Sequence, residues 1–162
     1  MGRGGAWVFM GNEDGGRTVI FRIYYLGQMG EGFPREVTRK IEMRDTQTLD
    51  DLQEAIIFDA FGWDEGHMYS FFFDNIPYSQ ARDMEYSCST GPPDPFSGKR
   101  PNPTSTKLKD LNLKQGQKFL FLFDFGDDQQ FGIEVAGFGR SRSKAPYPMV
   151  LERKGRAPKQ YS

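Results

Sequence analysis

The chain has 162 residues, a length that suits one domain with its own hydrophobic core. Its 21 Lys and Arg residues nearly balance its 22 Asp and Glu residues, which argues against the strongly basic composition of a dedicated nucleic-acid-binding protein. Aromatic residues make up 15% of the sequence and include 15 Phe, so we expect a core built largely from aromatic rings.

The sequence also contains features that indicate a cellular compartment. Its single cysteine, Cys88, excludes a disulfide within the chain and agrees with a reducing environment. Residues 1–17 hold glycine and charge where a secretory signal would be apolar, and no apolar stretch approaches the length of a membrane span. We therefore expect a cytoplasmic protein that does not associate with membranes.

The N-terminal part predicts an arm followed by a β-hairpin. Residues 1–17 are rich in glycine and predict a flexible arm. Residues 18–26 carry β-branched and aromatic side chains, which favour a strand. After turn residues 27–34, residues 35–44 alternate between apolar and polar side chains, which predicts a returning strand with one solvated face.

A helix is predicted to follow the hairpin. The Thr48 hydroxyl is suited to cap the free amides of a helix N-terminus, and the carboxylates of Asp50 and Asp51 favour the positive end of the helix dipole. Gly62 supplies a left-handed residue at which the helix can end. The apolar residues at helical spacing are Leu49, Leu52, Ile56 and Ala60.

The second half of the chain predicts three more strands. Residues 68–74 are aromatic enough for one strand, whereas residues 75–107 are rich in proline and polar side chains and predict a long mobile loop. Residues 119–123 are all apolar, which is typical of a strand buried on both faces at the centre of a sheet. The last strand is predicted at 130–135, and the basic residues 139–162 are predicted to form a partly docked tail.

Together these elements predict an α+β domain with a mixed sheet of about five strands packed on one main helix. The order of a hairpin, a helix and later strands around a central one is typical of the β-grasp fold, or ubiquitin-like roll. A general two-layer α+β domain is the alternative. The domain is expected to span residues 18–138, between the arm (1–17) and the tail (139–162).

The predicted central strand ends in an acidic turn that contains Asp124, Asp127 and Asp128. Short carboxylates next to glycine are typical of turns because they tolerate turn dihedral angles and accept hydrogen bonds from free amides. With Asp64 and the single histidine, His67, these carboxylates are also weak candidates for a Mg²⁺ or Ca²⁺ site. A lone histidine is more often a packing or capping residue than a metal ligand.

The C-terminal segment is the one feature that suggests an anionic partner. Its basic residues are Arg140, Arg142, Lys144, Arg153, Lys154, Arg156 and Lys159. Such residues can follow a phosphate backbone while an aromatic ring, such as that of Trp63, stacks on a base. A solvated charged tail explains the same pattern.

Several segments together resemble the plasmid pRi ORF-three-like family over residues 19–152. They are Leu49-x-x-Leu52, Ala60-Phe61-Gly62-Trp63-Asp64-x-x-His67, Leu111-x-Leu113, Phe123-Asp124-Phe125-Gly126-Asp127-Asp128 and Tyr147-Pro148. The resemblance implies an elaborated β-grasp-like domain of bacteria and plasmids that also travels with mobile elements. It implies no established biochemical function.

The chain departs from this family pattern at positions where family members carry histidine or cysteine. Gln53, Tyr69 and Phe131 stand where histidine is frequent in the family, and the segment after Tyr147-Pro148 lacks the family's cysteine. These departures remove potential metal ligands and acid–base groups, and they argue against an enzyme.

The leading hypothesis is therefore a non-enzymatic binding domain with an unknown protein partner, no catalytic residue and no cofactor, either monomeric or weakly dimeric. One alternative is a nucleic-acid-binding accessory protein that uses the basic tail. A second is a divalent-metal-dependent phosphodiester or nucleotide enzyme that uses the Asp124–Asp128 turn. The candidate binding residues are Trp63, Asp124, Asp127, Asp128, Arg140, Arg142 and Lys144.

Overall fold

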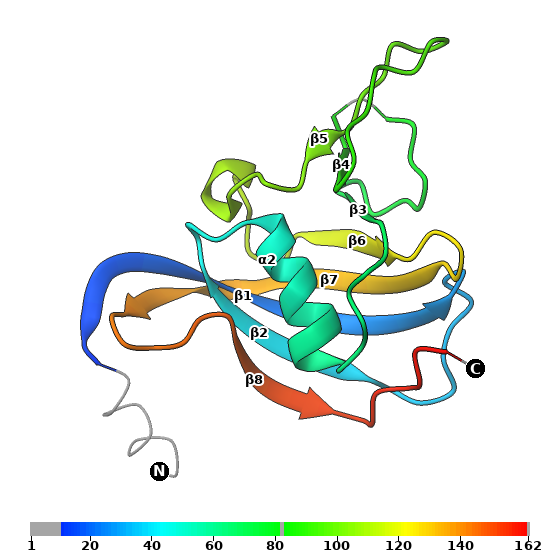
Figure 1. Ribbon diagram of the computed structural model, residues 1–162. Helices are drawn as coiled ribbons and strands as arrows, with labels where there is room; N and C mark the ends of the chain where they lie inside the picture. The colour runs from blue at the N-terminus through cyan, green and yellow to red at the C-terminus, as the bar shows by residue number, and fades with distance from the viewer. Residues whose placement is uncertain (1–10, 82, 162) are drawn as a thin grey trace.

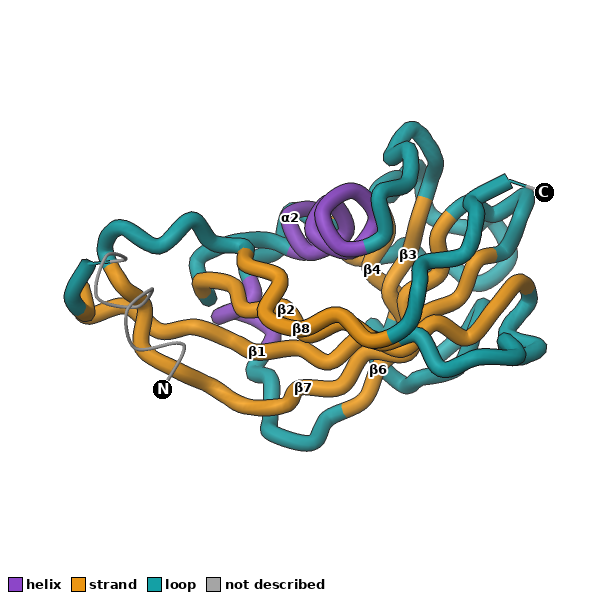
Figure 2. The backbone as a smooth tube through the Cα atoms, turned by 90° about the horizontal axis from the view of Figure 1, so that it is seen from below, coloured by secondary structure: helices purple, strands orange, loops and turns teal. Residues whose placement is uncertain are grey.

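The computed structural model of the protein describes residues 11–81 and 83–161. The described strands are β1 (Glu13–Gln28), β2 (Thr38–Arg44), β3 (Tyr69–Phe72), β4 (Glu85–Ser87), β5 (Asn102–Pro103), β6 (Lys118–Phe123), β7 (Gln129–Arg142) and β8 (Met149–Lys154). They form one mixed sheet in the order β5-β4-β3-β6-β7-β1-β2-β8, with a short helix across one face (Figures 1 and 2). Its neighbours are antiparallel except for the β4–β5 pair.

The fold is therefore α+β, as predicted, but the sheet is larger than expected. It has eight strands rather than about five, and this strand order does not confirm the β-grasp arrangement in particular. The predicted hairpin is present, because β1 and β2 pair from Thr18 opposite Arg44 to Tyr24 opposite Thr38. On its other side, β1 pairs with β7 along almost its whole length, so the first strand lies inside the sheet.

The helix begins and ends where the sequence predicts. The Thr48 side chain accepts a hydrogen bond from the Asp51 backbone amide (3.2 Å), and the Asp51 carboxylate accepts one from the Thr48 amide (2.9 Å). This capping box starts α2 (Leu49–Glu54), which continues as a π-helical segment, η1 (Ala55–Ala60). Gly62, with a φ of +69°, adopts the left-handed conformation that ends it.

Two arginines from different strands bind the C-terminal end of this helix. Arg39 Nε and Arg153 Nη1 both donate hydrogen bonds to the Ala60 carbonyl, at 3.0 and 2.9 Å. Arg153 Nη2 also donates to the Asp59 carbonyl at 3.0 Å. These cations offset the partial negative charge of the free helix carbonyls, so Arg153 of the expected basic tail has a structural role.

The core between the helix and the sheet consists largely of aromatic rings, as the composition predicts. The fully buried phenylalanines on this side are Phe21, Phe71, Phe119, Phe121, Phe123 and Phe131. The Phe71 and Phe121 rings stack with their centroids 4.7 Å apart, and Phe73 stacks on Phe119 at 4.4 Å. Offset stacking of this kind stabilises a core beyond the burial of area alone.

Strand β6 is buried on both faces, as predicted for residues 119–123. Its phenylalanines belong to the main core. Leu120 and Leu122 point to the other face, where they form a second, smaller cluster with Phe72 and the partly buried Leu26. The sheet is therefore covered on both sides at this strand.

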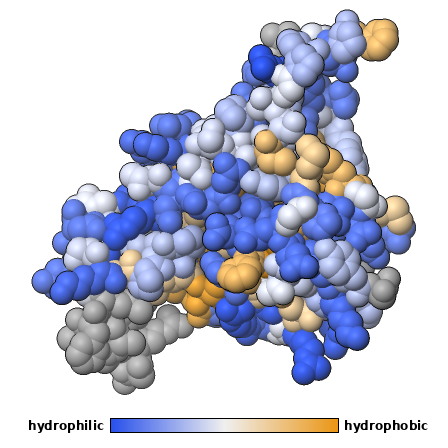
Figure 3. All heavy atoms as spheres, in the orientation of Figure 1, coloured by the Kyte–Doolittle hydropathy of each residue, from blue (hydrophilic) through white to orange (hydrophobic). Residues whose placement is uncertain are grey.

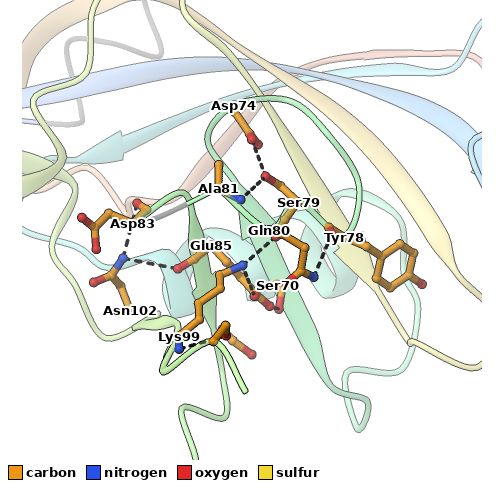
Figure 4. A network of polar contacts seen from close by, with 12 residues as sticks. Ser70, Asp74, Tyr78, Ser79, Gln80, Ala81, Asp83, Glu85, Lys99 and Asn102 are labelled. Atoms are coloured by element: carbon orange, nitrogen blue, oxygen red, sulfur yellow. Dashed lines mark hydrogen bonds and ion pairs between the residues drawn. The ribbon is translucent and has the colours of Figure 1, made fainter. Parts of the chain in front are cut away.

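The region 75–107 is not the single mobile loop that was expected. It contributes β4 and β5 at one edge of the sheet, and it carries the polar network of Figure 4. Lys99 Nζ donates to the Ser79 carbonyl at 2.6 Å and forms an ion pair with Glu85 at 3.7 Å, while the Ser79 hydroxyl donates to Asp74. These polar bonds hold the region in place together with the Tyr86 ring, which packs against Phe73 with the centroids 5.1 Å apart. The expectation missed them because polar bonds and a single ring leave no hydrophobic periodicity in the sequence.

The expected boundaries of the arm and the tail also fall inside strands. Strand β1 begins at Glu13, and the Asp14 carboxylate accepts hydrogen bonds from Arg44 (2.7 Å) and from the Ser141 hydroxyl. Strand β7 continues to Arg142, and β8 pairs with β2, so residues 139–142 and 149–154 belong to the sheet. The part of the arm over residues 1–10 lies outside the described residues.

The face of the molecule in Figure 3 is largely hydrophilic, with separate hydrophobic patches. Among the described residues, no helix combines the length and the apolar character needed to cross a membrane.

Candidate functional site

A cleft with convergent polar and aromatic groups lies between the loop that follows β1 and the C-terminal residues of the chain. It has a volume of about 540 Å³. The lining residues that matter for its chemistry are Tyr25, Glu31, Phe33, Asp127, Gln129 and Tyr161. We call this space the C-terminal cleft.

Tyr25 connects the C-terminal cleft to the aromatic core. Its ring lies 5.1 Å from that of Phe33 and 5.3 Å from that of Phe131, and it meets the Trp63 ring edge-on at 5.9 Å. Its hydroxyl donates to Gln129 Oε1 at 2.6 Å. Burial raises the pKa of the Tyr25 phenol, so this hydroxyl stays protonated and remains a donor.

The rim of the C-terminal cleft requires glycine. Gly27 has a φ of +91°, and a Cβ atom there would lie 2.4 Å from the Gly32 carbonyl oxygen. The Gly32 amide in turn donates to the Leu26 carbonyl at 2.7 Å. The rim is therefore a tight loop that only glycine can form at residue 27 without displacing the chain.

The acidic turn borders this cleft and has the turn structure that its sequence favours. Asp124 and Asp128 have φ values of +62° and +51°. Asp124 Oδ1 accepts from the amides of Gly126 (3.2 Å) and Asp127 (3.3 Å), which is the local bonding expected of an aspartate in a turn. Asp127 lines the cleft directly.

His67 lies between the acidic turn and the C-terminal residues. Its Nδ1 is 3.4 Å from Asp124 Oδ2, and its Nε2 is 2.7 Å from the Tyr161 hydroxyl. The sequence suggested that His67 lies near the turn, and it gave no sign of Tyr161. The result is a carboxylate–imidazole–phenol chain at one end of the molecule.

The five weak metal-ligand candidates do not assemble into a metal site. Asp128 Oδ1 accepts from Gln130 Nε2 at 3.0 Å, while Asp64 is bonded through its backbone to the Gln160 side chain. Over residues 11–81 and 83–161, no group of three or more His, Cys, Asp or Glu side chains is placed to hold a metal ion.

Trp63 is buried and does not offer a ring face for stacking on nucleic-acid bases. Only 4% of its surface is exposed, because its ring packs against Tyr25, Phe61 and Phe131. Its indole Nε1 donates to the Pro158 carbonyl at 2.9 Å. Trp63 thus belongs to the site as a donor to the C-terminal segment.

The basic candidates lie far from the acidic turn. The turn comes immediately before β7, whereas Arg140 and Arg142 are at the other end of this 14-residue strand and Lys144 follows it. At about 3.3 Å per residue, the separation is roughly 40 Å. Arg140 forms a long ion pair with Glu13 (4.0 Å), and the Arg142 carbonyl accepts from Arg44 (2.7 Å). The structure therefore divides the predicted binding residues between two ends.

Sequence reasoning missed several residues of the C-terminal cleft. Glu31 and Phe33 lie in a segment that was interpreted only as turn material, and Gln160 and Tyr161 lie in the expected tail. The available signal was the run of glycines at 27, 30 and 32, because closely spaced glycines mark a backbone that folds tightly.

Comparison with known proteins agrees with the family resemblance. The sequence profile described as plasmid pRiA4b ORF-3-like protein matches residues 31–160. The fold is similar to a crystal structure described as a protein of unknown function, MM3350, from Methanosarcina mazei Go1. That match has a TM-score of 0.67 and 20% sequence identity, and it covers 91% of this chain and 74% of the other, so it supports the fold alone. A search of curated proteins gave no significant match. Because the profile spans most of its length, the chain belongs to the plasmid pRiA4b ORF-3-like protein family, whose function is uncharacterised.

Proposed function

We propose that this chain is a non-enzymatic binding domain whose C-terminal cleft takes a basic segment of a partner protein. The observation that carries the proposal is the lining of the cleft. The aromatic residues Tyr25, Phe33 and Tyr161 line it together with the acidic residues Glu31 and Asp127. A Lys or Arg side chain gains from both groups, because ring faces and carboxylates each attract cations.

The electrostatic surroundings support a cationic ligand. Asp64, Asp124 and Asp127 all raise the pKa of the Tyr161 phenol, after the larger effect of its partial desolvation. These carboxylates thus disfavour negative charge at the end of the cleft, and the same field favours a positive ligand. Among the described residues that line the cleft, Lys159 is the only basic one.

The size of the cleft suits a side chain or a short peptide. Its volume of about 540 Å³ falls within the roughly 300–1,000 Å³ typical of ligand pockets. A flat interface between folded domains would not need such a cleft, whereas an extended segment can insert one or two side chains into it.

The test is an NMR titration of the ¹⁵N-labelled protein with a capped Ala-Lys-Ala-Arg-Ala peptide and with a matched Ala-Glu-Ala-Glu-Ala peptide. We expect amide shifts around Glu31 and Asp127 with the basic peptide alone, and a weakening of binding as salt is added. Glu31→Gln should weaken binding about 2- to 5-fold, since an ion pair at an exposed position such as this contributes about 0.4–1 kcal/mol. Glu152→Gln on β8, which removes a carboxylate paired with Lys40, is the matched control. Equal shifts with both peptides would refute the proposal.

The enzyme hypothesis has one supporting observation, the Asp124–His67–Tyr161 chain. A carboxylate that orients an imidazole is a common arrangement for acid–base catalysis. The raised pKa of Tyr161, however, keeps the phenol protonated at neutral pH and makes it a poor nucleophile. The enzyme hypothesis is tested by measuring hydrolysis of a nitrophenyl phosphodiester with added Mg²⁺ or Mn²⁺. If the hypothesis holds, Tyr161→Phe should abolish turnover.

Nucleic-acid binding has less support, because Trp63 is buried and Arg153 is bonded to the helix carbonyls. We also propose that the protein acts in the cytoplasm and that it is associated with mobile elements. The single cysteine supports the reducing compartment.

A further inference from the structure

We infer that the C-terminal segment, residues 157–161, occupies a peptide-binding groove as an internal ligand, and that an extended partner peptide of the same chemistry displaces it. This inference rests on the proposed function and names its ligand: a short segment with a proline, a basic residue, an amide side chain and an aromatic residue. The proposed function concerns the charge of the ligand. The present inference concerns how the groove binds the ligand's backbone and its amide side chain.

The segment is held as a bound peptide would be. The Trp63 indole donates to the Pro158 carbonyl at 2.9 Å. The Asp64 amide donates to Gln160 Oε1 at 2.7 Å, and Gln160 Nε2 donates back to the Asp64 carbonyl at 2.9 Å. Such a reciprocal pair recognises a carboxamide specifically, because a carboxylate offers no donor and an ammonium offers no acceptor.

The Trp63 wall of the groove is held by the core as well as by the segment. Its ring packs against the rings of Tyr25, Phe61 and Phe131, and Asp64 follows it directly in the chain. In the docked state the indole N–H lies at a largely buried position, bonded to the Pro158 carbonyl. A peptide that covers Trp63 in place of the segment must therefore bring a carbonyl to the same donor, because an unpaired buried donor is unfavourable.

The segment borders two clefts. Its residues 158–161 line both the C-terminal cleft and a second cleft of about 430 Å³. The second cleft is walled by Phe61, Gly62, Trp63 and Asp64. Displacement of the segment would join the two clefts into one groove floored by aromatic rings, long enough for an extended peptide.

A partner peptide fits the groove better than the tail of a second copy. A segment joined to its own groove by a short connection has an effective concentration on the order of millimolar, so a second copy with the identical sequence and micromolar concentration cannot compete with it. A partner must bind more tightly than the internal segment or act when that segment is weakened.

The test measures binding of a labelled peptide in trans. A fluorescein-labelled peptide, Gly-Arg-Ala-Pro-Lys-Gln-Tyr-Ser, copies residues 155–162. It is titrated with the full-length protein and with its Gln160→Ala variant, which lacks both hydrogen bonds to Asp64. We expect the variant to bind the peptide about 10- to 100-fold more tightly, because two lost bonds raise the fraction of molecules with an open groove. Gln115→Ala, a change of the same kind at an exposed position, should leave the affinity unchanged.

Changes in the peptide keep the test independent of protein folding. Replacing its glutamine by alanine should weaken binding to the Gln160→Ala variant about 10-fold, and scrambling its order should abolish binding. Equal affinity of wild type and variant, or equal binding of the scrambled peptide, would overturn the inference. Analytical ultracentrifugation checks whether a second copy of the chain occupies the groove. Dimers that dissociate when the peptide is added would show that it does, and would also overturn the inference.

The two proposals fail in different ways. If the basic pentapeptide does not bind the wild-type protein while the tail peptide binds the variant, the charge argument for the C-terminal cleft fails and the groove stands. If the pentapeptide binds and the tail peptide does not, the cleft binds cations but the segment is not an internal ligand.

Discussion

Strand β6 should be stabilised from both faces of the sheet, and Leu122→Ala tests the less obvious face. Leu122 is fully buried with Leu120 and Phe72 on the side of the sheet away from the helix. This second cluster is small, so the neighbours have little freedom to refill the space left by a truncated side chain. The sequence pattern of five consecutive apolar residues implies cover on this face as much as on the other.

Truncation of a buried leucine to alanine costs about 2–5 kcal/mol, because transfer free energy and cavity formation add together. We expect about 3 kcal/mol for Leu122→Ala, and about 4 kcal/mol for Phe121→Ala, since the Phe121 ring also stacks on Phe71. Against a total stability of roughly 5–15 kcal/mol, either change removes a large share of the free energy of unfolding.

The assay is urea unfolding followed by circular dichroism. With a urea dependence of about 2 kcal/mol per molar, a loss of 3 kcal/mol lowers the midpoint by about 1.5 M. Lys118→Ala at the exposed start of the same strand is the control and should change stability by less than about 0.5 kcal/mol. If Leu122→Ala lowered the free energy of unfolding by less than about 1 kcal/mol, the argument that β6 is buried on the face away from the helix would be refuted.

Three further predictions concern caps and polar groups. Thr48→Ala removes the helix N-cap and should lower the free energy of unfolding by about 1 kcal/mol in the same urea assay. Gln53 Nε2 is buried without a hydrogen-bond partner among the described residues, so Gln53→Met should be neutral or stabilising by up to about 1 kcal/mol, and a clear fall in melting temperature would contradict this. The Ser141 hydroxyl, with a backbone amide and the Arg44 guanidinium, lowers the pKa of Asp14 to about 2. Because the pKa of Asp14 is lower in the folded state, its contribution to stability is present above the ordinary pKa of 3.8 and is lost as the pH falls toward 2. An NMR titration of the carboxyl group should find that Ser141→Ala raises the pKa of Asp14.

Much of the fold follows from interactions between residues close in sequence. The Thr48 cap, the left-handed Gly62, the β1–β2 hairpin and the wholly apolar β6 were all predictable, because capping, dihedral preference and side-chain periodicity act over a few residues. The turn form of the acidic residues after β6 was predictable for the same reason, since Asp124 bonds to amides two and three residues ahead. The family resemblance likewise rested on short motifs, such as residues 60–67 and 123–128, and the family profile confirms it.

The tertiary structure alone decided the rest. Strands β4, β5 and β8 join the sheet through backbone pairing, and only single apolar residues of β4 and β8, Tyr86 and Val150, pack against the core. So few apolar contacts leave no clear strand periodicity in the sequence. The candidate site depends on still longer separations: Trp63 meets Pro158 across 95 residues, and His67 meets Tyr161 across 94. No local preference specifies such pairs. They form because the sheet brings the end of the chain against the aromatic core, where an indole donor and a peptide amide need partners.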